Sequence, residues 1–150
     1  MANNYTQFSV EVPLRKGKDI LAEVGRLIDE GHAARAKADV EGRYDDLDAI
    51  GFDFQYQLGE SPLILFAEEH GSPDDLVSFI ETLLKRNLAI EPVMAEWAYT
   101  CSKARPGEFG GGGALITKTG TYWFLPSRFM ELKWAQVKKQ RNKPKRKKRR

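Results

Sequence analysis

The chain has 150 residues, of which 24 are Lys or Arg and 21 are Asp or Glu. Ten of the basic residues lie in the last fourteen positions, which contain no acidic residue. Residues 1–136 therefore keep 14 basic and 21 acidic residues, a net charge of about −7. This division predicts a globular domain over residues 1–136 and a solvated, disordered basic tail over residues 137–150.

Several classes of protein are excluded by the composition. No apolar run approaches the roughly 20 residues that a membrane-spanning helix needs. The N-terminal residues lack the basic segment and apolar stretch of a secretory signal, so we expect a cytoplasmic protein, or a nuclear one in a eukaryotic cell. The single cysteine, Cys101, excludes an internal disulfide and a cysteine-rich metal site. We expect no metal and no cofactor.

The first part of the chain shows a strand pattern followed by a helix pattern. Residues 5–12 alternate between apolar and polar side chains, which predicts a half-buried strand. Apolar residues then recur at three- and four-residue spacing over residues 20–28, which marks one face of a helix. Gly31 is expected to cap this helix, whereas the Ala-rich residues 33–38 either extend it or begin a loop. The acidic, aperiodic residues 39–51 are expected to form a loop.

A hairpin and a second helix are expected next. Residues 52–58 alternate and residues 63–67 form a short apolar run, so we expect two strands joined by a turn. Ser72 is expected to begin a helix, because its side-chain oxygen can accept a hydrogen bond from an exposed amide of the first turn. Pro73 suits that first turn. The buried stripe of this helix would be Leu76, Val77, Ile80, Leu83, Leu84 and Leu88.

The last part of the chain contains further strand patterns and a third helix pattern. Residues 93–99 alternate and predict a strand, and the glycine-rich residues 102–113 are expected to form a loop. Residues 114–118 and 121–124 are expected to form a short hairpin. A short helix over residues 129–137 would carry the domain into the tail, with four partly buried apolar residues: Phe129, Leu132, Trp134 and Val137.

The predicted order of elements is β-α-β-β-α-β followed by extra strands. This order favours an α+β fold with a ferredoxin-like antiparallel sheet, because two helices on one face of such a sheet bury both apolar stripes at once. The sequence thus predicts this core, an extra C-terminal β-hairpin, a short helix and the disordered basic tail.

The glycine-rich segment is a candidate anion-binding loop. Consecutive backbone amides in unusual conformations form a concave anion site, and Lys and Arg side chains add positive charge. The candidate residues are Ser102, Lys103, Arg105, Gly110, Gly111, Gly112 and Gly113. A mobile linker between two strands is the favoured alternative. A catalytic thiol at Cys101 is disfavoured, because Arg105 follows it too closely for a cysteine phosphatase loop and no histidine partner is evident.

Residues 51–56, Gly-Phe-Asp-Phe-Gln-Tyr, resemble part of the RNP1 pattern of RNA-recognition motifs. That resemblance implies aromatic side chains on an exposed strand face that stack on bases. Asp53 and Gln55 depart from the pattern. Because two amphipathic helices need an apolar sheet face, we instead expect Phe52, Phe54 and Tyr56 to form core.

The remaining titratable residues predict no catalytic site. Glu68, Glu69 and His70 are adjacent, as are Asp74 and Asp75, but nothing in their spacing fixes a pair of carboxyl groups in a cleft. We expect these groups to lie on the solvated surface.

The basic tail predicts nucleic acid as a partner, either DNA or RNA. Lys and Arg clusters bind phosphate backbone without reading base sequence. The expected contact residues are Lys138, Lys139, Arg141, Lys143, Lys145, Arg146, Lys147, Lys148, Arg149 and Arg150. The expected function is therefore a small non-enzymatic, nucleic-acid-associated protein. Two alternatives stay open: a protein-interaction module that regulates a nucleic-acid-processing machine, and a small enzyme that binds a phosphorylated ligand at the loop of residues 100–113.

Overall fold

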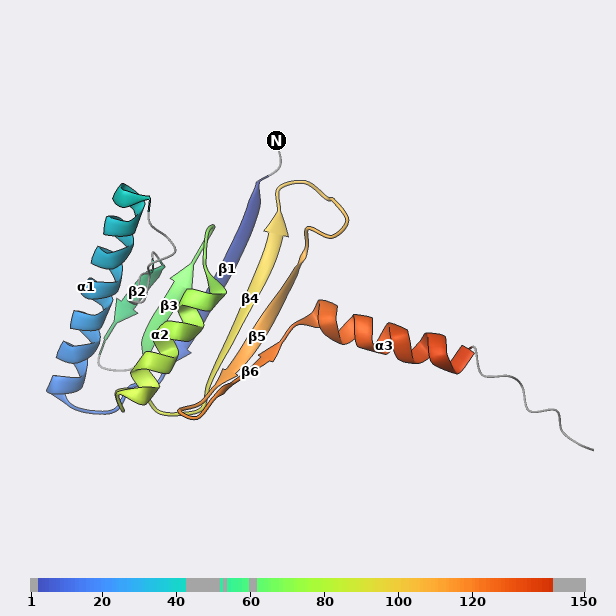
Figure 1. The fold of residues 1–150 in the computed structure, drawn as a ribbon. Coiled ribbons are helices and arrows are strands. Elements are labelled where there is room, and N and C mark those ends of the chain that lie inside the picture. The colour runs from blue at the N-terminus through green and yellow to red at the C-terminus, as the bar shows by residue number, and fades with distance from the viewer. Residues whose placement is uncertain (1–2, 43–51, 53, 60–61, 142–150) are drawn as a thin grey trace, which may run out of the picture.

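The computed structural model describes residues 3–42, 52, 54–59 and 62–141. These residues form six strands and three helices (Figure 1). The elements in chain order are β1 (Asn4–Val12), α1 (Lys18–Glu41), β2 (Gln55–Leu58), β3 (Leu63–Ala67), α2 (Pro73–Lys85), β4 (Val93–Cys101), β5 (Gly110–Ile116), β6 (Thr121–Phe124) and α3 (Pro126–Arg141).

The strands form one antiparallel sheet in the order β2-β3-β1-β4-β5-β6. Helix α1 connects β1 to β2, and helix α2 connects β3 to β4. Both helices lie on the same face of the sheet (Figure 1). The prediction of an α+β fold with an antiparallel sheet is confirmed. The six-stranded order does not match the four-stranded ferredoxin-like topology, because the expected C-terminal hairpin, β5 and β6, extends the same sheet beyond β4.

The core lies between the sheet and the two helices. Strand β1 contributes Phe8, Val10 and Val12, which alternate with exposed residues as its period-two pattern predicts. Helix α1 buries Val24, Leu27 and Ile28, and helix α2 buries a longer apolar stripe that includes Phe79. Each such aliphatic or aromatic side chain stabilises the fold by about 1.5–3 kcal/mol relative to an exposed position.

Helix α1 is about three turns longer than its apolar pattern alone predicts. Gly31 is buried inside the helix, and Gly42 caps it with a left-handed φ of 64° and an N–H that donates to the carbonyl of Ala38. The prediction of a cap at Gly31 is therefore wrong. Ala is the strongest helix former, so the Ala-rich residues continue the helix rather than begin a loop. Of the expected loop, residues 39–41 are helical and residues 43–51 lie outside the described part of the chain.

Helix α2 begins as predicted. The hydroxyl of Ser72 accepts a hydrogen bond from the backbone N–H of Asp75 at 3.2 Å, and Pro73 occupies the first turn. The helix ends just before Asn87, which has a positive φ of 61°.

Phe52 and Phe54 are fully buried core residues that precede β2. Their rings stack at 4.1 Å between centroids, and the Phe52 ring lies 4.7 Å from that of Phe79 on α2. Tyr56 lies on the helix side of the sheet, 5.8 Å from the ring of His32 on α1. The core interpretation is confirmed for Phe52 and Phe54, so these two rings do not form an exposed base-stacking face. The expectation that Tyr56 is also core is wrong, since its side chain is 38% exposed.

Helix α3 projects away from the rest of the molecule (Figure 1). It is longer than predicted, and it continues through Val137 to Arg141. Its four apolar residues Phe129, Leu132, Trp134 and Val137 are 47–63% exposed, so the prediction that they are partly buried against the domain is wrong. The described part of the chain contains no helix with the length and apolar character needed to cross a membrane.

Candidate functional site

The glycine run lies in a strand. Gly110, Gly111, Gly112 and Gly113 begin β5 and pair with Tyr99, Ala98, Trp97 and Glu96 of β4. None of the four glycines has a positive φ, whereas an anion nest needs backbone that alternates in handedness. The prediction that these residues form a loop is wrong, and the concave nest on which their anion-binding role depended is absent from the described backbone.

The glycines allow β5 to approach Trp97 closely. A Cβ atom on Gly112 would lie 2.7 Å from the indole ring of Trp97, and a Cβ on Gly111 would lie 2.4 Å from the Trp97 carbonyl oxygen. Trp97 is almost completely buried, and its ring packs edge-on against Trp123 of β6 at 5.8 Å. The local role of glycine here is therefore close packing of backbone against an indole.

The other residues of the candidate anion site lie in the connection between β4 and β5. Arg105 lies 3.8 Å from a carboxylate oxygen of Glu108, and the Cys101 thiol donates to the other oxygen at 2.8 Å. The hydroxyl of Ser102 accepts a hydrogen bond from the Asn3 amide. The structure thus separates the loop residues from the glycines and places a carboxylate beside Arg105. Anion binding by Ser102, Lys103 and Arg105 stays a prediction.

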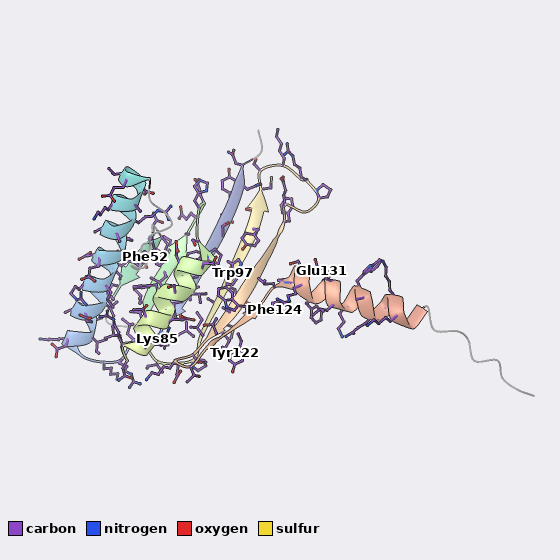
Figure 2. The ribbon with its side chains drawn as sticks, viewed as in Figure 1. Phe52, Lys85, Trp97, Tyr122, Phe124 and Glu131 are labelled. Carbon is purple, nitrogen blue, oxygen red and sulfur yellow. The ribbon has the colours of Figure 1, made fainter. Side chains whose placement is uncertain are left out.

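An apolar groove of about 890 Å³ crosses β4, β5 and β6. Its prominent side chains are Met94, Leu115, Tyr122 and Phe124, which the strand register places on the sheet face opposite α1 and α2. We call this face the open face. Met94, Tyr122 and Phe124 are 67%, 70% and 56% exposed, and Figure 2 shows the two β6 aromatics near the edge of the sheet.

The glycine run also shapes this groove. Gly111 and Gly113 are the β5 residues that share the open face with Leu115, and they pair with Ala98 and Glu96 of β4. Because neither glycine has a side chain, the groove is deeper at β5 than at the larger residues of β4 and β6 on either side. The groove was not predicted from the sequence. The alternation in residues 93–99 places Met94 opposite the core, but it does not show that β5 and β6 carry apolar residues on the same face.

The charged strand residues on the open face are acidic. Among the described strand residues that point to this face, the charged ones are Glu11 of β1 and Glu96 of β4. Glu96 lines the apolar groove itself. The groove is thus an apolar surface with a carboxylate at one side.

Helix α3, which we call the arm (residues 126–141), is basic and apolar. It contains five basic residues and one acidic residue, Glu131. Met130, Trp134 and Val137 follow the i, i+4, i+7 spacing of one helix face, and all three are exposed. The ammonium group of Lys133 lies 5.8 Å from the Phe129 ring, and that of Lys138 lies 5.6 Å from the Trp134 ring.

The arm holds the first of the predicted nucleic-acid-binding residues. Lys138, Lys139 and Arg141 lie in its last turns, so the helix end expected near Val137 is wrong by one turn. The other seven predicted residues lie outside the described part of the chain: Lys143, Lys145, Arg146, Lys147, Lys148, Arg149 and Arg150.

The remaining titratable groups form no metal-binding cluster among the described residues. No three His, Cys, Asp or Glu side chains lie close enough together in residues 3–42, 52, 54–59 and 62–141 to hold a metal ion. His32 is a structural group, since its Nε2 lies 3.0 Å from the carbonyl oxygen of Phe54. His70 is exposed and lies beside Glu69 at 3.8 Å.

Comparisons with protein-family models, with curated proteins and with solved structures found no match to this chain.

Proposed function

We propose that the protein is a non-enzymatic, nucleic-acid-associated protein whose basic C-terminal segment, residues 138–150, binds phosphate backbone without sequence specificity. The observation that carries this proposal is the projection of α3: the segment begins on a helix that extends away from the domain (Figure 1). Residues 138–150 include ten basic residues and no acidic residue that could neutralise their charge.

The distance between the basic segment and the acidic domain supports this function. A 16-residue helix is about 24 Å long. That length is about three times the Debye length of roughly 8 Å at physiological salt. Residues 1–125, which precede the arm, have 12 basic and 20 acidic residues, and their net charge of about −8 therefore repels a polyanion only weakly at the end of the arm. A separate basic end can bind nucleic acid although the domain as a whole is acidic.

The side chains of the arm suit contact with the phosphate backbone of a nucleic acid and stacking on its bases. Trp134 is exposed and lies beside Lys138. An exposed aromatic ring next to a cation is the pairing by which proteins bind single-stranded nucleic acid, because every base can stack on the ring. The positive charges supply affinity that depends on salt and does not depend on sequence.

The proposal is tested with two shortened chains, one ending at Arg141 and one ending at Val137. The first keeps the described helix and removes seven of the ten basic residues; the second removes all ten. Affinity for duplex DNA and for single-stranded RNA is measured by fluorescence anisotropy over a range of salt concentrations. On duplex DNA we expect the slope of log K against log salt to fall by up to about 6 when the seven basic residues are lost.

A matched control removes positive charge from the domain. Lys16, Lys18 and Lys37 are exposed basic residues at or in α1, and their joint substitution by Gln should change neither the affinity nor the salt slope appreciably. If the chain that ends at Val137 binds as tightly as the full chain, with the same slope, the proposal is wrong.

The second candidate function is a protein-interaction module, and the apolar groove on the open face favours it. Exposed apolar patches of this kind commonly mark protein interfaces. A pull-down that retains a protein after nuclease treatment would support this function over direct binding of nucleic acid.

A further inference from the structure

Two apolar surfaces of this chain lack a partner among the described residues: the groove on the open face, and the side of the arm that carries Met130, Trp134 and Val137. We propose that the arm of one copy docks in the groove of a second copy, so that two copies exchange arms in a symmetric dimer. This proposal does not depend on nucleic-acid binding, and in the dimer Trp134 is buried in the groove and does not also stack on a base.

The two surfaces are complementary in shape, since one is concave and the other is a convex helix, and both are apolar. The groove is a concave apolar surface formed by strands, with Met94 and Tyr122 among its exposed walls. The arm is a helix with an apolar stripe of about two turns. An amphipathic helix in an apolar groove is a common recognition mode, in which anchors at i, i+4 and i+7 enter the groove.

The charges of the two surfaces are also complementary. The charged residues of the described strands on the open face are both acidic, Glu11 and Glu96. The arm has five basic residues and one acidic residue. Lys133 lies one turn from Phe129 and Val137, on the same side of the helix as the apolar stripe, where it would face Glu96. Such complementarity favours this helix over an acidic or neutral one.

The arm begins at its own groove, which Pro126 lines, but the connection is too short for the rest of the helix to fold back into it. Strand β6 ends at Phe124 and α3 begins at Pro126, so Leu125 alone joins them. The Phe129 N–H donates to the carbonyl of Leu125 at 3.1 Å, and the Phe129 ring lies 6.3 Å from that of Phe124. These contacts and the fixed φ of proline direct the helix away from its own sheet. In Figure 2, Glu131 on the arm lies beyond the edge strand that carries Phe124.

An exchange of arms between two copies forms a closed dimer. Each copy gives one arm and receives one, so the same interface forms twice and no surface is left to extend the assembly. The arm is about 24 Å long, and six strands span about 24 Å between the sheet edges. A docked arm can thus reach from the groove over β6, β5 and β4 towards Glu11 on β1.

The first test measures the oligomeric state of the full chain by light scattering and analytical ultracentrifugation over a range of concentrations. We expect a dimer that dissociates on dilution. Met94→Asp in the groove and Trp134→Asp in the arm should each raise the dimer dissociation constant by about tenfold or more, since buried tryptophans dominate such interfaces. Ala135→Asp adds the same charge on the opposite side of the arm and should change the dissociation constant less than about twofold. A chain that is monomeric at every concentration overturns the proposal.

The second test identifies the occupant of the groove. In a Cys101→Ser background, a chain with Met94→Cys is mixed with a size-tagged chain with Trp134→Cys, and disulfides are formed by mild oxidation. The proposal predicts a disulfide between the two chains of different size. When both substitutions are in one chain, a disulfide within that chain at high dilution would show that the arm folds onto its own sheet. That result, or a dimer whose two cysteines do not crosslink, overturns the exchange of arms.

Discussion

Gly112 and Trp97 face each other across the β4–β5 pair so closely that a Cβ atom on Gly112 would lie 2.7 Å from the indole carbon Cζ2. The indole cannot move aside easily, because it is almost completely buried and packs against Trp123. We predict that Gly112→Ala lowers the free energy of unfolding by about 1–3 kcal/mol, the usual cost of overpacking. Urea denaturation followed by tryptophan fluorescence would measure the change.

Gly110 provides the control for this prediction. It lies in the same strand, but a Cβ there would meet only the Tyr99 ring at 3.8 Å, an ordinary contact. Gly110→Ala should leave stability unchanged or raise it by up to about 1 kcal/mol, because alanine has fewer unfolded conformations than glycine. Equal losses in the two variants would show that the glycines act through chain flexibility and not through the contact with Trp97.

Thr121 connects the edge strand β6 to helix α2. Its hydroxyl donates to a carboxylate oxygen of Glu81 at 2.6 Å, and this hydrogen bond, together with Lys85, holds the pKa of the Glu81 carboxyl below its ordinary value. Thr121→Val should lower the free energy of unfolding at pH 7 by about 1 kcal/mol. Thr100→Val is the control, since Thr100 lies on the open face, away from α2.

The same contact predicts a pH dependence. The folded state binds a proton at Glu81 less readily than the unfolded state, so the contact stabilises the fold above the ordinary pKa near 4.5 and is lost as the pH falls through the lower folded value. The stability difference between the native chain and Thr121→Val should therefore be largest near neutral pH and should shrink below pH 4.5. A difference that is constant from pH 7 to acid pH would contradict the role of the Glu81 carboxylate.

Ser72 caps helix α2 by accepting the Asp75 N–H at 3.2 Å. Ser72→Ala should lower the free energy of unfolding by about 1 kcal/mol, because the amide loses its partner. Ser72→Asp keeps an acceptor at the same position and should restore most of that loss. Thermal denaturation by circular dichroism would separate the two variants.

His32 holds the segment before β2 against helix α1. Its Nε2 lies 3.0 Å from the Phe54 carbonyl oxygen, and its ring lies 5.0 Å from that of Phe52. We expect His32→Ala to cost about 1–2 kcal/mol of stability through the lost hydrogen bond and packing. His70→Ala removes an exposed histidine and should cost less than about 0.5 kcal/mol. Similar losses at both positions would argue against a structural role for His32.

Local patterns predicted those elements whose buried and exposed residues differ in polarity. The alternation that ends at Val12 predicted β1, and the alternation from Val93 predicted β4. Ser72 predicted the start of α2 from its side-chain chemistry alone. These features depend on residues close in sequence, so periodicity and capping rules suffice.

Helix α1 and the arm show where such patterns were insufficient. Gly31 is a residue typical of a helix end, but the Ala-rich residues that follow it continue the helix, and Gly31 is buried inside α1. Phe129 and Trp134 have the composition of a buried face, but the arm leaves the domain after a single connecting residue. For the arm, the position of the helix relative to the core decided the outcome, and no short sequence window contains that information.

The sequence by itself determined the α+β class, the two helices of the core, and the separation of an acidic domain from a basic end, because these follow from composition and local periodicity. The tertiary structure alone decided that Gly111 and Gly112 are strand residues. Glycine has no side chain to show a period, and its necessity here comes from Trp97, which lies on the neighbouring strand. The groove was also decided by the tertiary structure, because it forms only when three strands align Met94, Leu115 and Tyr122 on one face.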